Sequence, residues 1–269
     1  MRYGDSNWRS TQRIRLDINN VFGPNGLTSA EIEAEAARAA EAIAAVQNRR
    51  TELGWPLLPE QDVTPFEQFA AAHRDRIDTF VVLGIGGSAL GNIAVQTAIN
   101  GPFYNLLPRE QRGGPRLLVL DNSDPELNAG ALRTLDLKRT MFNVISKSGT
   151  TAETMASFLY FRQALVEAVG EEKLGDHIVL TTDPSSGFLR QIGQREGWTM
   201  FDLPPKVGGR FSVLTSVGLL SAAMTGVNLR ELLAGASYGG ELAANPDPLR
   251  NPAALGALVN YLCFRKGKP

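Results

Sequence analysis

The sequence contains a single cysteine, Cys263, and only two histidines, so it offers no internal disulfide and few imidazole ligands. Cys263 stands among apolar residues, and we expect it to be a buried free thiol of a reducing compartment. An excess of charge of either sign is also lacking, because the 27 Lys and Arg residues nearly balance the 28 Asp and Glu residues. The whole surface therefore has no field that favours nucleic acid or an anionic membrane as a partner.

Long hydrophobic runs are missing as well. No stretch reaches the ~18 consecutive apolar residues that a membrane helix needs, and the first residues lack the apolar region of a signal peptide. We therefore expect a soluble, cytoplasmic protein. The sequence does have enough apolar residues, 43%, for a sizeable core. Its 269 residues predict one large domain with additions, or two domains.

Short apolar runs alternate with helical patterns through the middle of the chain. The expected strands are 79–83, 117–120, 141–145, 178–182 and 198–201. The expected helices between them are 89–99, 125–135, 151–168 and 185–196. Continuous apolar strands that alternate with helices predict a parallel sheet covered on both faces, a three-layer α/β/α fold. Ligands of such sheets bind beyond the C-terminal ends of the strands.

Helical patterns flank this region on both sides. Thr28 and Glu31 have capping-box spacing and open a helical run that reaches about residue 50. A second helix is expected near 65–75. After the last strand, helices are expected over 212–224, 229–243 and 252–265. His73 lies in a polar helical run and is expected at the surface. His177 precedes the fourth strand, at the wrong end for a site, and no metal cluster is visible.

The loop after the first expected strand, residues 84–91, has the sequence GIGGSALG. Glycines let the backbone approach an anion, and the following helix offers free N–H groups. The same segment fits the dinucleotide pattern GxGxxA, with Asp121 after the second strand as a candidate ribose ligand. Asp121 comes later than the ~20-residue spacing of that pattern. Phosphate binding, dinucleotide binding and a plain tight turn remain open for this loop.

The loop after the third expected strand carries four hydroxyls and one ammonium within six residues. These residues are Ser146, Lys147, Ser148, Thr150 and Thr151. Hydroxyls and the N–H groups of a helix N-terminus suit phosphate oxygens, and lysine supplies a positive charge. A phosphate monoester is the simplest ligand for this set. The alternative is a Ser/Thr-rich helix cap with a solvated lysine. The Walker order is absent, so a nucleoside triphosphatase is not indicated.

The loop after the fifth expected strand, residues 204–212, has the sequence PPKVGGRFS. Its Gly-Gly pair, Gly208 and Gly209, again allows a close backbone approach. Arg210 is a fixed cation beyond a strand end and can clamp a phosphate or stabilise an oxyanion. The alternative is a structural arginine paired with a carboxylate, and Glu153 is a candidate partner. Both interpretations are compatible.

These three loops, taken in order, resemble the prokaryotic type of glucose-6-phosphate isomerase, over residues from about 78 to at least 220. The resemblance implies a sugar isomerase (SIS) fold with a five-stranded parallel sheet, and an aldose–ketose isomerisation through an enediol that needs no cofactor. It also implies a homodimer that takes a sugar phosphate as substrate. On this basis we expect an N-terminal helical arm over 1–77, a phosphosugar-binding SIS domain over 78–225, and a helical connection over 226–269.

The resemblance also implies roles for single residues. Arg210 matches the arginine that stabilises the enediolate, and Glu153 matches an acid near that arginine. Phe211 stands where tyrosine is commoner. The substrate-binding residues implied are Gly87, Ser88, Ser146, Lys147, Ser148, Thr150, Thr151 and Gly209.

The general base, the ring-opening histidine and a further lysine of the resembled enzymes belong to a second SIS domain, and this sequence has no match for them. We therefore expect the chain to be an N-terminal portion with little or no turnover alone. Two alternatives stay open. One is a non-catalytic SIS domain that senses sugar phosphates, and the other is an NAD-dependent enzyme.

Overall fold

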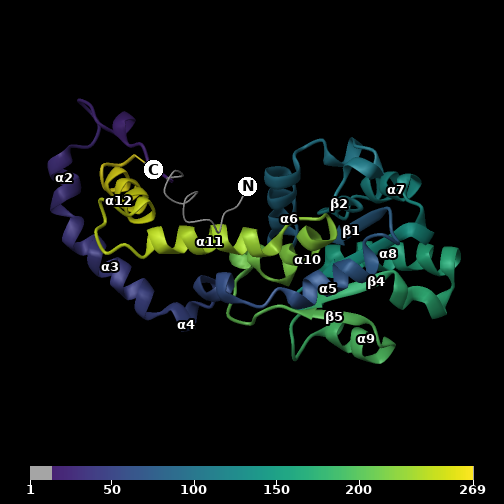
Figure 1. Ribbon diagram of the computed structural model, residues 1–269. Coiled ribbons are helices and arrows are strands. Elements are labelled where there is room, and N and C mark those ends of the chain that lie inside the picture. Colours follow the sequence, from purple (N-terminus) through teal and green to yellow (C-terminus); the bar gives the residue numbers. More distant parts are fainter. Residues whose placement is uncertain (1–13, 269) are drawn as a thin grey trace. The chain divides into compact units, whose positions relative to one another are not determined.

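The computed structural model describes residues 14–268 (Figure 1). The chain divides into two compact units. The larger spans Gln61–Arg230, and the smaller consists of the described residues up to Glu60 and from Glu231 onward. The domain boundaries predicted after residues 77 and 225 stay predictions, because a division into compact units does not define domains. The compact unit begins earlier because helix α5 (Thr64–His73) packs its Phe66 ring 5.2 Å from that of Phe201.

A five-stranded, wholly parallel sheet forms the centre of the larger unit, with the strand order β2-β1-β3-β4-β5. The strands are β1 (Thr79–Leu83), β2 (Arg116–Leu120), β3 (Thr140–Ile145), β4 (Ile178–Thr182) and β5 (Thr199–Asp202). The predicted parallel sheet is thus confirmed, and every expected strand is found within about a residue of its predicted bounds. Strands β1, β3 and β4 are buried along their whole length, which explains their continuous apolar sequence.

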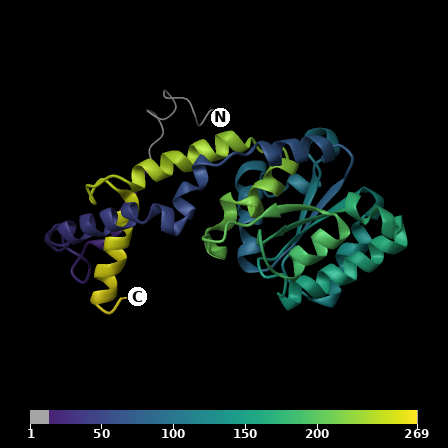
Figure 2. The same cartoon turned by 90° about the horizontal axis from the view of Figure 1, so that it is seen from below.

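Helices cover both faces of this sheet, as the sequence predicts (Figure 2). One face packs against α8 (Ala152–Val169), with the rings of Phe142 on β3 and Phe161 on α8 5.1 Å apart. The opposite side holds α10 (Ser216–Met224), which contacts β1, α5 and α6 (Leu90–Val95) and is buried at every residue. This central α10 joins the sheet to the helix that follows the first loop. The fold therefore holds the loops of β1 and β5 on one shared scaffold.

The other α-helices are α2 (Ser29–Ala34), α3 (Ala36–Asn48), α4 (Arg50–Leu53), α7 (Pro125–Thr134), α9 (Phe188–Glu196), α11 (Leu229–Ala243) and α12 (Pro252–Arg265). A π-helical turn occupies Gln96–Asn100, and 3-10 helices occupy Asn19–Val21, Trp55–Glu60, Gly86–Ser88, Tyr104–Leu106, Arg109–Gln111, Leu137–Arg139, Glu171–Asp176 and Gly209–Leu214. None of the helices among residues 14–268 is long and apolar enough to cross a membrane.

Three helices differ from their predicted extent. The helix expected over 89–99 changes to π-helical geometry at Gln96. The helix expected over 185–196 begins only at Phe188, because Gly187 has a φ of 99° that ends the preceding turn. The helix expected over 212–224 begins at Ser216, after a 3-10 segment capped by Thr215. The last two differences fall in the segments that directly follow strands β4 and β5.

The smaller unit has its own apolar core, formed by Leu27, Ile32, Leu258 and Leu262 from α2, α12 and the segment before α2. The predicted capping box at Thr28 is present: its Oγ1 accepts from the Glu31 amide at 3.2 Å.

The expectation that Cys263 is buried is wrong. Cys263 is only partly buried, because it lies at the end of α12 (Pro252–Arg265), on the margin of the small core.

Candidate functional site

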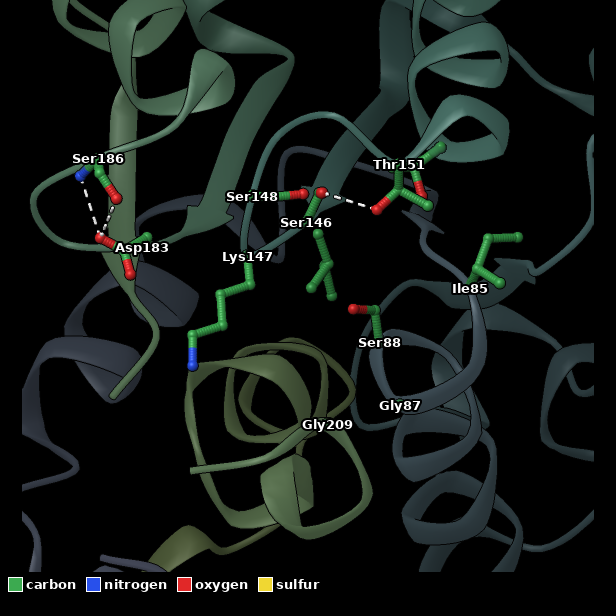
Figure 3. A pocket seen from close by; sticks show the side chains of 12 residues that line it. Ile85, Gly87, Ser88, Ser146, Lys147, Ser148, Thr151, Asp183, Ser186 and Gly209 are labelled. Carbon is green, nitrogen blue, oxygen red and sulfur yellow. Dashed lines mark hydrogen bonds between the residues drawn. The ribbon is translucent and has the colours of Figure 1, made fainter. Parts of the chain in front are cut away.

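A cavity of about 370 Å³ opens at the C-terminal edge of the sheet (Figure 3). Its lining comes from the loops after β1, β3 and β4 and from the 3-10 segment after β5: Ile85, Gly87, Ser88, Ile145, Ser146, Lys147, Ser148, Thr151, Thr154, Asp183, Ser186 and Gly209. The strand order makes β1 and β3 neighbours whose outgoing connections run to opposite sides of the sheet. In open α/β sheets such a switch point is where ligands bind.

The loop after β3 folds tightly around the hydroxyl of Ser146. This side chain is 2% exposed, accepts the Gly149 amide at 3.0 Å and lies 3.2 Å from the Thr151 hydroxyl. Gly149 has a φ of +68°, and a Cβ there would stand 2.3 Å from the Leu189 backbone nitrogen. Only glycine therefore fits this turn, which brings the serine and threonine hydroxyls to one wall of the cavity.

Helix α8 starts at this wall with an uncapped N-terminus. Its N-cap residue, Thr151, makes no side-chain cap hydrogen bond. Beside it, the hydroxyl of Ser148 lies 3.2 Å from the Thr150 amide and 2.9 Å from the Thr150 hydroxyl. Thr150 itself does not line the cavity but holds Ser148 in place. First-turn amides and the positive end of the helix dipole favour an anion at this position.

Lys147 crosses the cavity edge toward the loop after β5. Its ammonium donates a hydrogen bond to the Pro205 carbonyl at 2.7 Å, while its stem lines the cavity (Figure 3). Because an ammonium has three donors, this contact leaves others for a ligand. Lys147 is thus the only side-chain cation that lines the cavity among the described residues, and its ammonium lies on the side of the loop after β5.

The opposite wall is built where the loops of β1 and β5 touch. A Cβ on Gly87 would stand 2.3 Å from the Gly209 carbonyl oxygen, so the two backbones are in direct contact. The Ser212 hydroxyl lies 3.0 Å from the Gly87 carbonyl and 2.7 Å from that of Gly209. This buried serine fastens both loops at once. The two glycine loops that the sequence singled out therefore form one surface.

Two buried residues that no sequence motif singles out support this wall. Asn92 on α6 donates to the Ser88 carbonyl at 2.9 Å, and Ser221 on α10 donates to the Asn92 side-chain oxygen. Both are 1% exposed. A polar residue in the interior of each of two mostly apolar helices is the sequence feature that could have pointed to this pair.

Asp183, after β4, also lines the cavity and was missed as a site residue. One carboxylate oxygen accepts the amides of Ser185 and Ser186, each at 3.0 Å. Hydrogen bonds, first from the Ser185 amide and then from the Ser186 side chain and amide, hold the pKa of Asp183 below its ordinary value. The carboxylate therefore orders the loop that brings Ser186 to the cavity.

Arg210 and Glu153, by contrast, do not line the cavity. Both side chains are exposed, and within the described part of the chain no ion pair joins them. The proposed pairing of Arg210 with Glu153 is thus not formed in this structure. Arg210 follows Gly209 directly, so its backbone stands beside the cavity while its side chain is exposed to solvent.

The two histidines lie away from the cavity. His73 is half-buried, not at the surface as expected, because its ring packs 4.4 Å from that of Phe69. Burial and the nearby Arg76 lower the pKa of His73. His177 contacts the Thr140 carbonyl at 2.8 Å, at the N-terminal end of the sheet as predicted. Among residues 14–268 no group of three His, Cys, Asp or Glu side chains is placed to hold a metal ion.

A comparison with protein-family models matches residues 67–264 to the family described as phosphoglucose isomerase. The chain belongs to the phosphoglucose isomerase family. Curated relatives agree with this assignment. The glucose-6-phosphate isomerase of Carboxydothermus hydrogenoformans is 43% identical over 264 residues, covering 95% of this chain and 57% of the relative. That of Rubrobacter xylanophilus is 42% identical over 253 residues, covering 93% of this chain and 57% of the relative.

Solved structures show the same fold. A hypothetical protein from Thermus thermophilus has a TM-score of 0.70 at 36% identity, over 82% of this chain and 52% of that one. A glucose-6-phosphate isomerase from Chlamydia trachomatis has a TM-score of 0.72 at 23% identity, over 89% of this chain and 51% of that one. The chain spans about half the length of the phosphoglucose isomerase relatives it matches.

Proposed function

We propose that this chain binds the phosphate group of a sugar phosphate and acts as part of a glucose-6-phosphate isomerase, which interconverts glucose 6-phosphate and fructose 6-phosphate. The observation that carries the proposal is the cavity at the ends of β1 and β3, which both the uncapped N-terminus of α8 and Lys147 line. Membership of the phosphoglucose isomerase family supports it.

The phosphate occupies the β3 side of the cavity in this proposal. The first-turn amides of α8 and the hydroxyls of Ser148 and Thr151 donate to its oxygens. Ser146 positions these groups through its contacts with Gly149 and Thr151. Lys147 neutralises part of the phosphate charge through the ammonium donors that its hydrogen bond to the Pro205 carbonyl does not use. Thr150 contributes by holding Ser148.

The sugar carbons face the opposite wall, which Gly87, Ser88 and Gly209 form. Glycine at two of these positions lets the ring approach the backbone closely. A bulky side chain there would fill the space that the sugar needs. The close contact of the two loops gives this wall a fixed shape, as an oriented substrate requires.

Arg210 is assigned to the chemical step. Isomerisation moves a proton between neighbouring carbons through an enediolate, whose negative charge develops on oxygen. A guanidinium aimed at that oxygen stabilises the charge. The Arg210 side chain makes no hydrogen bond or ion pair within residues 14–268, so its donors remain for the substrate. Glu153 supports Arg210 once the side chain turns toward the bound sugar.

Proton transfer needs a base near the reacting carbon. Asp183 is the only carboxylate among the described residues that line the cavity, and loop hydrogen bonds occupy one of its oxygens. We therefore assign the base to none of residues 14–268 and propose that the 269-residue chain alone binds its substrate with little or no turnover. We also propose that the isomerase works as a cytoplasmic homodimer and needs no cofactor.

The test combines binding with activity. Isothermal titration of the purified chain with glucose 6-phosphate and fructose 6-phosphate should give saturable binding, with glucose as the unphosphorylated control. A coupled assay should show little conversion. Substantial turnover would contradict the proposal that residues 14–268 supply no base. Absence of any sugar-phosphate binding would contradict the proposed function. Binding without turnover, when the whole reading frame is also inactive, would favour a sensing SIS domain instead.

A further inference from the structure

We propose that the hydroxyl of Thr154 is a further binding group of this cavity and contacts the phosphate of the bound sugar phosphate. This inference rests on the proposed function. It extends the phosphate ligands beyond the hydroxyls of the loop after β3 to a residue inside helix α8.

Thr154 has a buried hydroxyl with no protein partner. The residue is 2% exposed and lines the cavity, yet its Oγ1 makes no hydrogen bond within the part of the chain that the structure describes. Buried polar groups are nearly always paired, because an unpaired one loses its hydration without compensation. The other described side chains with such orphaned atoms do not line the cavity. We therefore infer that a ligand in the cavity provides the missing hydrogen-bond partner of the Thr154 hydroxyl.

The helix does not satisfy this hydroxyl itself. Within a helix, a threonine commonly donates to the carbonyl four residues earlier. Thr154 is the third residue of α8, so the corresponding carbonyl belongs to Thr150, which precedes the helix, and no such bond forms. One turn further, the hydroxyl of Ser157 does have a partner, the Asn128 amide at 3.2 Å. The missing bond is thus specific to the turn at the cavity.

The position of Thr154 on α8 brings its hydroxyl toward the phosphate. Thr151 and Thr154 are three residues apart and share one face of the helix. Thr154 lies in the first turn of α8, and its Cα–Cβ bond leans toward the start of the helix, as in every helical residue. The uncapped amides that favour an anion lie on that turn. An anion seated there meets the Thr151 and Thr154 hydroxyls on the same side.

The variant Thr154→Val tests the proposal, because valine keeps the shape and removes only the hydroxyl. Affinity for both glucose 6-phosphate and inorganic phosphate should fall about tenfold, the loss of one hydrogen bond to a charged group. The melting temperature of the ligand-free variant should rise, since an unpaired buried hydroxyl is gone. Weaker binding combined with a more stable free protein is a result that a purely structural threonine would not give.

Two further variants complete the experiment. Thr154→Ser keeps the hydroxyl and should retain most of the affinity. Thr134→Val removes an exposed helical hydroxyl that bonds the Ala131 carbonyl, and should leave both affinities unchanged. If Thr154→Val does not fold, Thr154→Ala provides the same comparison.

Three outcomes would overturn the assignment. Unchanged affinity for both ligands in Thr154→Val removes Thr154 from the site while leaving the proposed function intact. A loss for glucose 6-phosphate with none for inorganic phosphate places the hydroxyl on the sugar and overturns the phosphate contact. A wild-type chain that binds neither ligand overturns the proposed function as well, so the failures are distinguishable.

Discussion

A Cβ on Gly87 would lie 2.3 Å from the carbonyl oxygen of Gly209, whereas a Cβ on Gly209 would lie 3.8 Å from the nearest atom of Gly87. The contact between the two loops is therefore asymmetric. Only at Gly87 does the neighbouring backbone leave no room for a side chain.

This asymmetry makes a paired prediction. Gly87→Ala should push the loops of β1 and β5 apart, lower the free energy of unfolding by about 1–3 kcal/mol and weaken sugar-phosphate binding. Gly209→Ala is the matched control and should leave the melting temperature nearly unchanged, because its added methyl makes only ordinary contact. Thermal unfolding and titration of both variants measure the difference. Equal melting temperatures for the two variants would show that the loops separate without cost.

Lys147 gives a prediction about charge. Lys147→Ala should weaken the binding of sugar phosphate by ~1.5–3 kcal/mol, the value of a hydrogen bond to a charged group. Lys138 is an exposed lysine of the 3-10 helix Leu137–Arg139, at the opposite end of the sheet, and Lys138→Ala is the control. Titration calorimetry at fixed ionic strength provides the measurement. Unchanged affinity in Lys147→Ala would remove this lysine from the site.

The buried pair of Asn92 and Ser221 predicts a stability effect. Ser221→Ala leaves the Asn92 side-chain oxygen buried without its donor, which should cost about 1–3 kcal/mol of unfolding free energy. Because Asn92 holds the Ser88 carbonyl, binding should weaken as well. Urea unfolding measures the first effect, with the exposed Ser123→Ala as the control. A variant as stable as the wild type would mean that another group satisfies Asn92.

Asp183 predicts a pH dependence. Its folded pKa is lowered, so the carboxylate stabilises the fold above its ordinary pKa of about 3.9, and this contribution is lost as the pH falls through the folded pKa. Asp183→Ala should therefore be less stable than the wild type near neutral pH, with a difference that shrinks as the solution is acidified below that range. Melting temperatures of both proteins over the acidic range check this. A constant difference would attribute the effect to something other than ionisation.

The sequence was sufficient for the fold because strands such as β1 and β3 are buried on both faces and consist of continuous apolar residues. It also located most of the cavity wall, since Gly87, Lys147 and Thr151 follow strand ends. It missed Thr154, which reads as an ordinary helical residue. The missing hydrogen bond becomes visible only when every possible acceptor has been placed in space.

Side-chain direction was the other limit. Arg210 follows Gly209, which lines the cavity, but its own exposed side chain neither lines the cavity nor pairs with Glu153. Sequence position fixes the backbone of such a residue, whereas a long, charged side chain at the surface takes its direction from the solvent and from any ligand present. The same holds for His73, whose ring is drawn against Phe69 by packing that its polar neighbours in sequence do not indicate.

The hydrogen bond from Ser212 to the Gly87 carbonyl joins residues 125 positions apart. Closing a loop of that length costs conformational entropy, which the folded segment between the two residues must offset. The cavity wall is therefore absent from any folding intermediate in which β5 and the segment after it are still unpaired. Ligand added during refolding would stabilise only molecules that have completed the larger unit, so the proposed sugar-phosphate binding would report on the completion of that unit.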